Sequence, residues 1–278
     1  MVMSAACRPS SADPSGSIPG TGRLPPMPDA AAPVFPMAGA PALAIEPLFP
    51  MALGRVQLAP DPLDTALLLQ RALELRERDP SEEGVAWTGD VRGAGELHRD
   101  PLFAPLIGRL ALHAWAYLAA LGFDRRRLSL HVQRSWPVIS EAGEQVGRHH
   151  HPNAHLSAIY YLNGDGSGRS GCLRLFAPRQ VNELVPGLAV GQDGPIGADA
   201  ALNRPWYDVA PRAGLLLLFP SSVDHAVLPN EDPDDTRFSL SIDFVLTAPA
   251  TAADPGEYLA PHPGRWLAIG EDGGDPGA

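Results

Sequence analysis

The sequence predicts a mainly β protein, an antiparallel β-sandwich or jelly roll with flanking helices. Two helical patterns come first, at about 62–78 and 104–121, and several short strand patterns follow Gly122. Helices followed by a series of short strands are typical of this class. With 278 residues, 45% of them hydrophobic, the chain is large enough to bury one substantial core.

Both predicted helices have recognisable ends. Asp61 and Pro62 provide a cap and a first-turn proline for a helix that runs to about Arg78. The apolar positions of this helix are Leu63, Leu67, Leu68, Leu73 and Leu75. The second helix ends before Gly122, a natural C-terminal stop. Its broad apolar face consists of Leu106, Ile107, Leu110, Trp115 and Leu118.

After Gly122 the apolar pattern becomes that of strands, and the first and last of them show a clear period of two. The predicted strands cover about 128–133, 156–162, 172–176, 214–219 and 236–246. In the last strand, every second side chain is polar, so one face carries Arg237, Ser239, Ser241 and Asp243.

Composition divides the chain into three regions. Residues 1–42 are rich in Pro, Ala, Ser and Gly, which predicts a disordered leader. Residues 43–248 carry the periodic patterns and form the predicted folded domain, and 249–278 read as an irregular tail. Within the domain, the Pro/Gly/Asn-rich segment 179–205 predicts a long surface excursion.

Charge and composition exclude several classes of partner. A formal net charge of -11 argues against a nucleic-acid-binding surface. The chain has no lysine, so an anionic ligand must be held by Arg, His or backbone N–H groups. No apolar run approaches the roughly 20 residues of a membrane span, and no secretory signal is visible. Two cysteines, Cys7 and Cys172, predict no structural disulfide, and we expect a cytoplasmic protein.

A tract of three histidines, 149–151, is the main candidate for a metal site. In an extended segment, residues two apart point the same way, so His149 and His151 can face one ion while His150 points away. Pro152 disfavours the helical region for His151 and keeps the tract extended. His225 follows a buried strand and can approach from an opposite strand. Three imidazoles with open positions suit Fe(II), Zn(II) or Cu(II).

A structural interpretation stands beside this one, because a His-rich tract is often a solvated loop. His98, His113, His131 and His262 have no such company and are assigned no role. His155 opens a strand and is expected to pack or to support a ligand.

Arg237 strengthens the functional interpretation. Ser239 and Ser241 lie on its face of the strand and leave room beside it. A guanidinium with an adjacent hydroxyl suits bidentate capture of a carboxylate. The alternative is an arginine on the solvent face of an edge strand.

The sequence resembles a family of 2-oxoglutarate/Fe(II)-dependent oxygenases over about 45–248. The resemblance is carried by the motifs His149-x-His151-Pro152-Asn153, Leu156-Ser157-x-x-Tyr160-Tyr161-Leu162, Leu173–Arg179, Gly214–Ser221 with His225, Pro229-Asn230, and Arg237-x-Ser239-x-Ser241, with Leu48-Phe49-Pro50 as the usual entry.

The resemblance implies a double-stranded β-helix, a cupin-like jelly roll, with iron at one mouth. It implies His149, His151 and His225 as iron ligands, with 2-oxoglutarate and O2 as co-substrates. Arg237 would pair with the distal carboxylate of 2-oxoglutarate, helped by Ser239, with Tyr161 as a further donor. Many members of the wider superfamily have Asp or Glu where this chain has His151. Asp224 is a weak candidate for a carboxylate ligand, because it points away from its neighbour His225.

The implied function is a dioxygenase that hydroxylates a small-molecule or peptide substrate and releases succinate and CO2. No catalytic residue is expected beyond the metal centre. Two alternatives stay open. One is a cupin-like three-His metalloenzyme that does not use 2-oxoglutarate, against which Arg237 and Ser239 argue. The other is a non-catalytic jelly-roll binding module.

Overall fold

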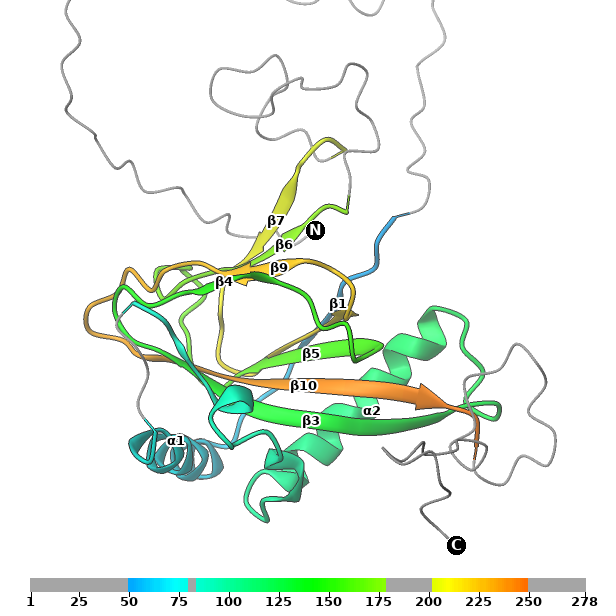
Figure 1. The fold of residues 1–278 in the computed structure, drawn as a ribbon, viewed down its shortest axis with the longest axis horizontal. Helices are drawn as coiled ribbons and strands as arrows, with labels where there is room; N and C mark the ends of the chain where they lie inside the picture. The colour runs from blue at the N-terminus through cyan, green and yellow to red at the C-terminus, as the bar shows by residue number, and fades with distance from the viewer. Residues whose placement is uncertain (1–49, 80–83, 179–201, 250–278) are drawn as a thin grey trace, which may run out of the picture. The chain divides into compact units, whose positions relative to one another are not determined.

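The computed structural model describes residues 50–79, 84–178 and 202–249 (Figure 1). The predicted leader 1–42, most of the predicted tail and residues 179–201 of the predicted excursion lie outside the described residues. The division of the chain into these three regions therefore stays a prediction.

Two antiparallel sheets form the β part of the fold, which confirms the predicted jelly roll with flanking helices. The six-stranded sheet has the order β1 (Gly54–Gln57), β8 (Leu215–Pro220), β5 (Leu156–Tyr161), β10 (Arg237–Thr247), β3 (Ser129–Ser140), β2 (Trp87–Thr88). The four-stranded sheet has the order β4 (Val146–His149), β9 (His225–Val227), β6 (Leu173–Phe176), β7 (Trp206–Val209). Figure 1 shows the smaller sheet lying across one face of the larger one.

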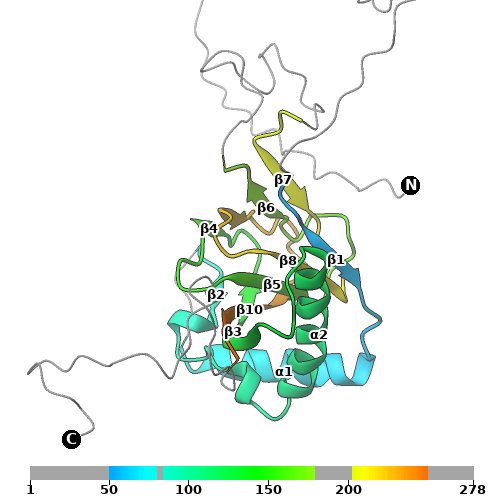
Figure 2. The same cartoon turned by 90° about the vertical axis from the view of Figure 1, so that its right-hand side faces the viewer.

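The larger sheet is buried on both faces. Its outer face packs on α1 (Pro62–Glu77) and α2 (Ala104–Ala120), which lie together on that side in Figure 2. Phe238, Leu240, Ile242 and Phe244 of β10 belong to this helix-covered core. The inner face packs against the smaller sheet through a second cluster that includes Tyr161, Leu175 and Phe219. The polar face of β10 therefore points between the sheets, where a site can be enclosed.

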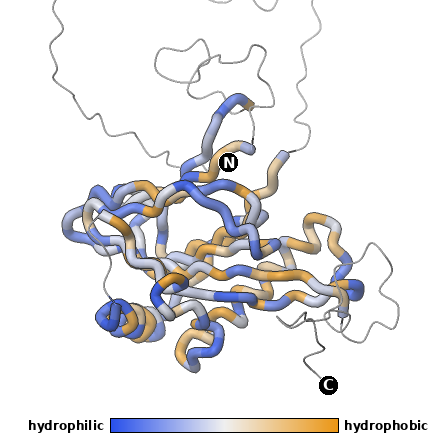
Figure 3. The backbone as a smooth tube through the Cα atoms, viewed as in Figure 1, coloured by the Kyte–Doolittle hydropathy of each residue, from blue (hydrophilic) through white to orange (hydrophobic). Residues whose placement is uncertain are grey.

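The helices confirm the predicted ends and correct one predicted face. Asp61 caps α1, accepting hydrogen bonds from the N–H groups of Leu63 at 2.8 Å and Asp64 at 3.2 Å. Leu68 is buried as an apolar position should be, whereas Leu63 and Leu67 are 78% and 52% exposed. Seen nearly end-on in Figure 3, α1 has a hydrophilic and a hydrophobic side. The predicted face of α2 is buried at Leu106, Ile107, Leu110 and Leu118.

We expect Asp61→Ala to lower the free energy of unfolding by about 1 kcal/mol, because two N–H groups in the first turn of α1 lose their acceptor. Urea unfolding followed by circular dichroism measures the change. Glu77→Ala at the other, exposed end of α1 is the control and should stay within about 0.5 kcal/mol of the wild type. An equal effect of both substitutions would contradict the capping role.

The strands extend beyond the predicted ones in several places. The strand predicted at 128–133 continues to Ser140 as β3, and five short strands, β1, β2, β4, β7 and β9, were not predicted as such. The expectation of no structural disulfide involves Cys7, which lies outside the described residues, so it stays a prediction; Cys172 itself is buried. No helix in the described ranges is long and apolar enough to cross a membrane. The cytoplasmic location stays a prediction.

Candidate metal centre

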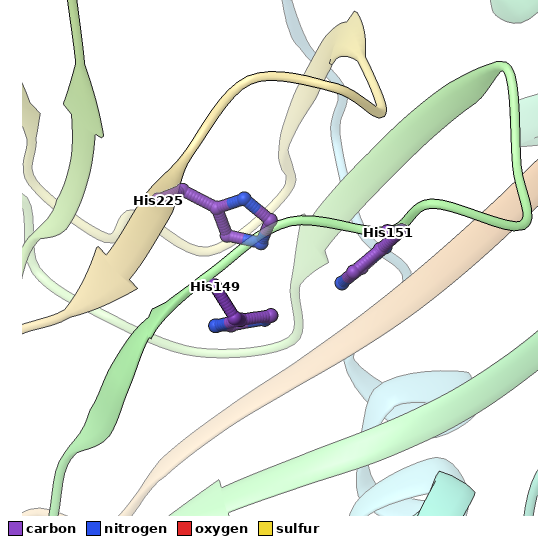
Figure 4. Close-up of side chains that lie close together, drawn as sticks. All are labelled: His149, His151 and His225. Carbon is purple, nitrogen blue, oxygen red and sulfur yellow. The ribbon is translucent and has the colours of Figure 1, made fainter.

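Three histidines from two separate parts of the chain meet between the two sheets (Figure 4). His149 ends β4 and pairs in register with His225, the first residue of β9. His151 follows in the loop after β4, where its N–H donates to the carbonyl of Ser221 at 3.0 Å. One ring nitrogen from each histidine lies within 4.8 Å of the other two. Two imidazoles bound to one ion at about 2.1 Å have nitrogens at most about 4.2 Å apart, so a small closure of the rings suffices.

Hydrogen bonds decide which ring nitrogen of each histidine is free. Nδ1 of His149 lies 2.7 Å from the carbonyl of Gly147, and Nδ1 of His225 lies 3.0 Å from that of Val223. Nδ1 of His151 lies 2.7 Å from a carboxylate oxygen of Asp243. Carbonyl and carboxylate oxygens only accept, so each Nδ1 carries the proton and donates. Nε2 is thereby left as the lone-pair nitrogen of all three rings, the arrangement usual for metal-binding histidines.

Burial keeps two of these rings neutral. Burial, with a smaller contribution from His149, lowers the pKa of His225 to about 3. The pKa of His149 is also lowered, chiefly by burial. A neutral imidazole can ligate a metal at neutral pH without first losing a proton.

His150 and Asp224 lie outside the histidine cluster. The Nδ1 atom of His150 is 3.2 Å from Oδ1 of Asp224. Oδ2 of Asp224 accepts from Nε and Nη2 of Arg148 at 2.9 and 2.6 Å. This pairing accounts for both side chains and leaves His150 out of the three-histidine cluster, although His150 also lines the cavity beside it.

A cavity of about 290 Å³ runs from the histidines to Arg237. Tyr161, Ser239 and Ser241 also line it, as the alternation of β10 and β5 requires. Ser239 lies directly opposite Tyr161 in the β10–β5 register. Burial raises the pKa of Tyr161 to about 12, so its hydroxyl keeps its proton at neutral pH. All six predicted site residues therefore line one cavity.

Arg237 has a buried donor without an acceptor. The side chain is 1% exposed, and Nη1 donates to the carbonyls of Ser170 at 3.1 Å and Gly171 at 3.0 Å. Nη2 has no hydrogen-bond partner among the described residues. A buried guanidinium donor left unpaired is costly, and an anionic ligand in the cavity would satisfy it.

Gly171 makes this arrangement possible. Its φ of +89° lies in the left-handed region, and a Cβ there would lie 2.7 Å from Nη1 of Arg237 and still closer to the carbonyl oxygen of Leu228. Only glycine leaves the guanidinium in place.

Sequence reasoning missed the residues that support His151. Asp243 is fully buried, and its carboxylate also accepts from Ser157 Oγ and Arg134 Nε, each at 2.8 Å. Burial alone would raise the pKa of Asp243, but the hydrogen bonds from His151, Ser157 and Arg134 outweigh it and lower the pKa. The alternation of β10 already put Asp243 on the face of Arg237, which was the available signal.

Three other histidines make side-chain contacts that serve the fold. His155 Nδ1 accepts from the N–H of Leu246 at 2.8 Å, which is a packing role. His98 and His131 contact the hydroxyls of Ser135 and Thr247. His262 lies outside the described residues.

Residues 134–243 match the family described as "Putative 2OG-Fe(II) oxygenase". The match confirms the resemblance expected from the motifs. Together with the three-histidine cluster, it confirms the predicted enzyme class, with Fe(II) and 2-oxoglutarate as cofactor and co-substrate. No curated protein matches the chain.

Several solved structures are similar in fold at low identity. The epimerase SnoN in complex with Fe3+, alpha ketoglutarate and nogalamycin RO is 19% identical, covering 76% of this chain and 91% of that one, with a TM-score of 0.47. A prolyl-4-hydroxylase of Pseudomonas putida is 20% identical, covering 70% and 92%, with a TM-score of 0.44. HygX of Streptomyces hygroscopicus, with nickel and 2-oxoglutarate bound, is 13% identical, covering 76% and 92%, with a TM-score of 0.45.

Proposed function

Taking residues 134–243 as a 2-oxoglutarate/Fe(II)-dependent oxygenase region, we propose that the chain hydroxylates a small-molecule or peptide substrate. 2-Oxoglutarate would leave as succinate and CO2, one atom of O2 entering the new hydroxyl and the other entering succinate. One observation carries the proposal. A cavity joins three histidines, each with a free Nε2, to a buried arginine nitrogen that has no acceptor in the part of the chain that the structure describes.

In this proposal His149, His151 and His225 hold Fe(II) through Nε2. Bound Fe(II), with 2-oxoglutarate and O2, supplies the oxidising chemistry. The protein contributes neutral rings whose orientation is held by their Nδ1–H bonds. With ligands from a strand end, a loop and a facing strand, the ion would be held between the sheets and screened from bulk water.

Arg237, Ser239 and Tyr161 would hold the distal carboxylate of 2-oxoglutarate. Nη1 of Arg237 is engaged by two carbonyls, which leaves Nη2 as the donor for the co-substrate. Ser239 and the protonated Tyr161 add hydroxyl donors from neighbouring strands. The cavity is also lined by Thr88, Val91 and Trp136, a mixed surface beside the histidines where a substrate would lie.

An anaerobic titration tests this function. Protein loaded with Fe(II) is expected to develop a visible charge-transfer band as 2-oxoglutarate is added, because the co-substrate chelates the ion. A substrate screen that reads succinate then follows. Iron binding without any interaction with 2-oxoglutarate would favour the cupin-like three-His enzyme instead. Chelator-free protein that binds no transition metal would favour the binding module.

A further inference from the structure

Asp243 is bound to three side chains that converge from different elements. Oδ1 accepts from Nδ1 of His151 at 2.7 Å and from Oγ of Ser157 at 2.8 Å, and Oδ2 accepts from Nε of Arg134 at 2.8 Å. The carboxylate is 0% exposed. Such a carboxylate contributes a fixed charge in a place that water does not screen.

The strand register explains how the carboxylate reaches a ring 92 residues away in the chain. Asp243 lies opposite Ser157 of β5 on one side and Arg134 of β3 on the other. The β10–β3 register shifts between Asp243 and Phe244. Bulges of this kind are common next to active sites, where they re-aim a side chain.

An aromatic ring also contacts His151. Trp136 packs against it with ring centroids 5.5 Å apart, and the guanidinium of Arg134 lies 4.6 Å from the centre of the Trp136 ring. Nη1 of Arg134 donates to Asp90 at 3.3 Å. His151 is therefore contacted both by a carboxylate and by an aromatic ring. His225 also has an aromatic neighbour, Phe219, with ring centroids 5.2 Å apart, so the carboxylate is what distinguishes His151 from the other two histidines.

A charge count distinguishes this network from the other two ligand supports. Asp243 and Asp90 bring two negative charges and Arg134 brings one positive charge, which leaves one net negative charge beside His151. The Nδ1 partners of His149 and His225 are neutral carbonyls. Three neutral histidine ligands carry no negative charge to offset the positive charge of a metal ion. The residues behind His151 bring one net negative charge close to the ligands.

We propose that Asp243 is a positioning residue of the metal centre, which orients His151 and supplies from outside the ligand set the negative charge that a carboxylate ligand would bring. The proposal rests on the proposed function, since it takes His151 as a ligand. It accounts for a histidine at the position where the wider superfamily has a carboxylate. The general physical basis is that an outer carboxylate raises the basicity of a histidine ligand and fixes its tautomer.

The test compares two aspartate substitutions in the full-length chain. Asp243→Asn keeps the shape and an acceptor oxygen but removes the charge, and we expect Fe(II) to bind about 10- to 100-fold more weakly in an anaerobic titration. Asp208→Asn is the matched control, because Asp208 also pairs with an arginine, accepting from Nε and Nη2 of Arg174 at 2.7 Å each, away from the histidines. The control should bind Fe(II) as the wild type does.

The positioning role would be overturned if folded Asp243→Asn bound Fe(II) as the wild type does, or if Asp243→Asn and Asp208→Asn lost Fe(II) affinity equally. The proposed function would remain intact in either case. A wild-type chain that binds no Fe(II) would remove both. These outcomes are therefore distinguishable.

A second measurement does not depend on how the variant folds. In metal-free wild-type protein, long-range proton–nitrogen NMR spectra should show the His151 proton on Nδ1, further downfield than the Nδ1 protons of His149 and His225, because its acceptor is charged. The signal is assigned by its loss in His151→Asn. A His151 proton on Nε2 would overturn the proposal.

Discussion

His225→Ala is expected to lose Fe(II) binding by more than about 100-fold and to stop producing succinate. The basis is that even the loss of an outer partner of a ligand costs about 10- to 100-fold in metal affinity. His225 is the only member of the cluster that comes from β9, so its removal leaves both remaining candidate ligands on one short segment, 149–151. Anaerobic titration with Fe(II) and a succinate assay measure the two losses.

His150→Ala is the matched control for iron binding. This histidine stands between the two candidate ligands in sequence, and its Nδ1 pairs with Asp224. The control should keep Fe(II) affinity within about threefold of the wild type, a change of under 1 kcal/mol. Succinate production at the wild-type level in His225→Ala would refute the assignment of His225. If His150→Ala lost as much Fe(II) affinity as His225→Ala, the assignment of His149 and His151 as ligands and His150 as a non-ligand would be refuted.

Arg237→Ala is expected to weaken 2-oxoglutarate binding while Fe(II) binding is retained. Removal of one partner from a buried, hydrogen-bonded charge pair costs about 2–5 kcal/mol, which corresponds to about 30-fold to several thousand-fold in affinity. The separation of effects follows from the geometry, because Arg237 contacts the carbonyls of Ser170 and Gly171 and none of the three histidines. Titration of the Fe(II)-loaded variant with 2-oxoglutarate, read by the charge-transfer band, measures the change.

Arg174→Ala provides the comparison for Arg237→Ala. Arg174 is partly buried, but its guanidinium is paired with Asp208 and does not line the cavity. The Arg174→Ala variant should bind 2-oxoglutarate with the affinity of the wild type. If Arg237→Ala binds 2-oxoglutarate as the wild type does, Arg237 is not the carboxylate partner. If it loses iron as well, the effect is a loss of structure and not of one contact.

Much of the site follows from periodicity and motif. The alternation of β10 put Arg237, Ser239 and Asp243 on one face, and the spacing of His149 and His151 put two rings toward one point. Both rules are local, since they depend only on the extended backbone. The helix ends could be predicted from the sequence for the same reason, because a capping residue such as Asp61 acts within one turn of the helix.

Other features depended on contacts that no local pattern reports. Leu63 and Leu67 have the spacing of an apolar face, yet they are exposed because α1 buries Leu68 and Ala72 instead. The short strands β4 and β9 exist because β9 pairs with β4 on one side and with β6 on the other, so they have little signal of their own. The support of His151 by Asp243 and Arg134 was likewise missed.

The sequence by itself determined which chemical groups this site contains, namely three histidines, one arginine and a run of alternating polar side chains. Side-chain chemistry and the two-residue period of a strand can both be seen in the sequence without knowledge of the fold. Tertiary structure alone decided that the polar face of β10 points between two sheets, that His225 meets His149 across β9 and β4, and that the carboxylate beside the metal site lies behind His151. The physical reason is that strand pairing joins residues far apart in the chain, and only that pairing fixes which side chains share a buried space.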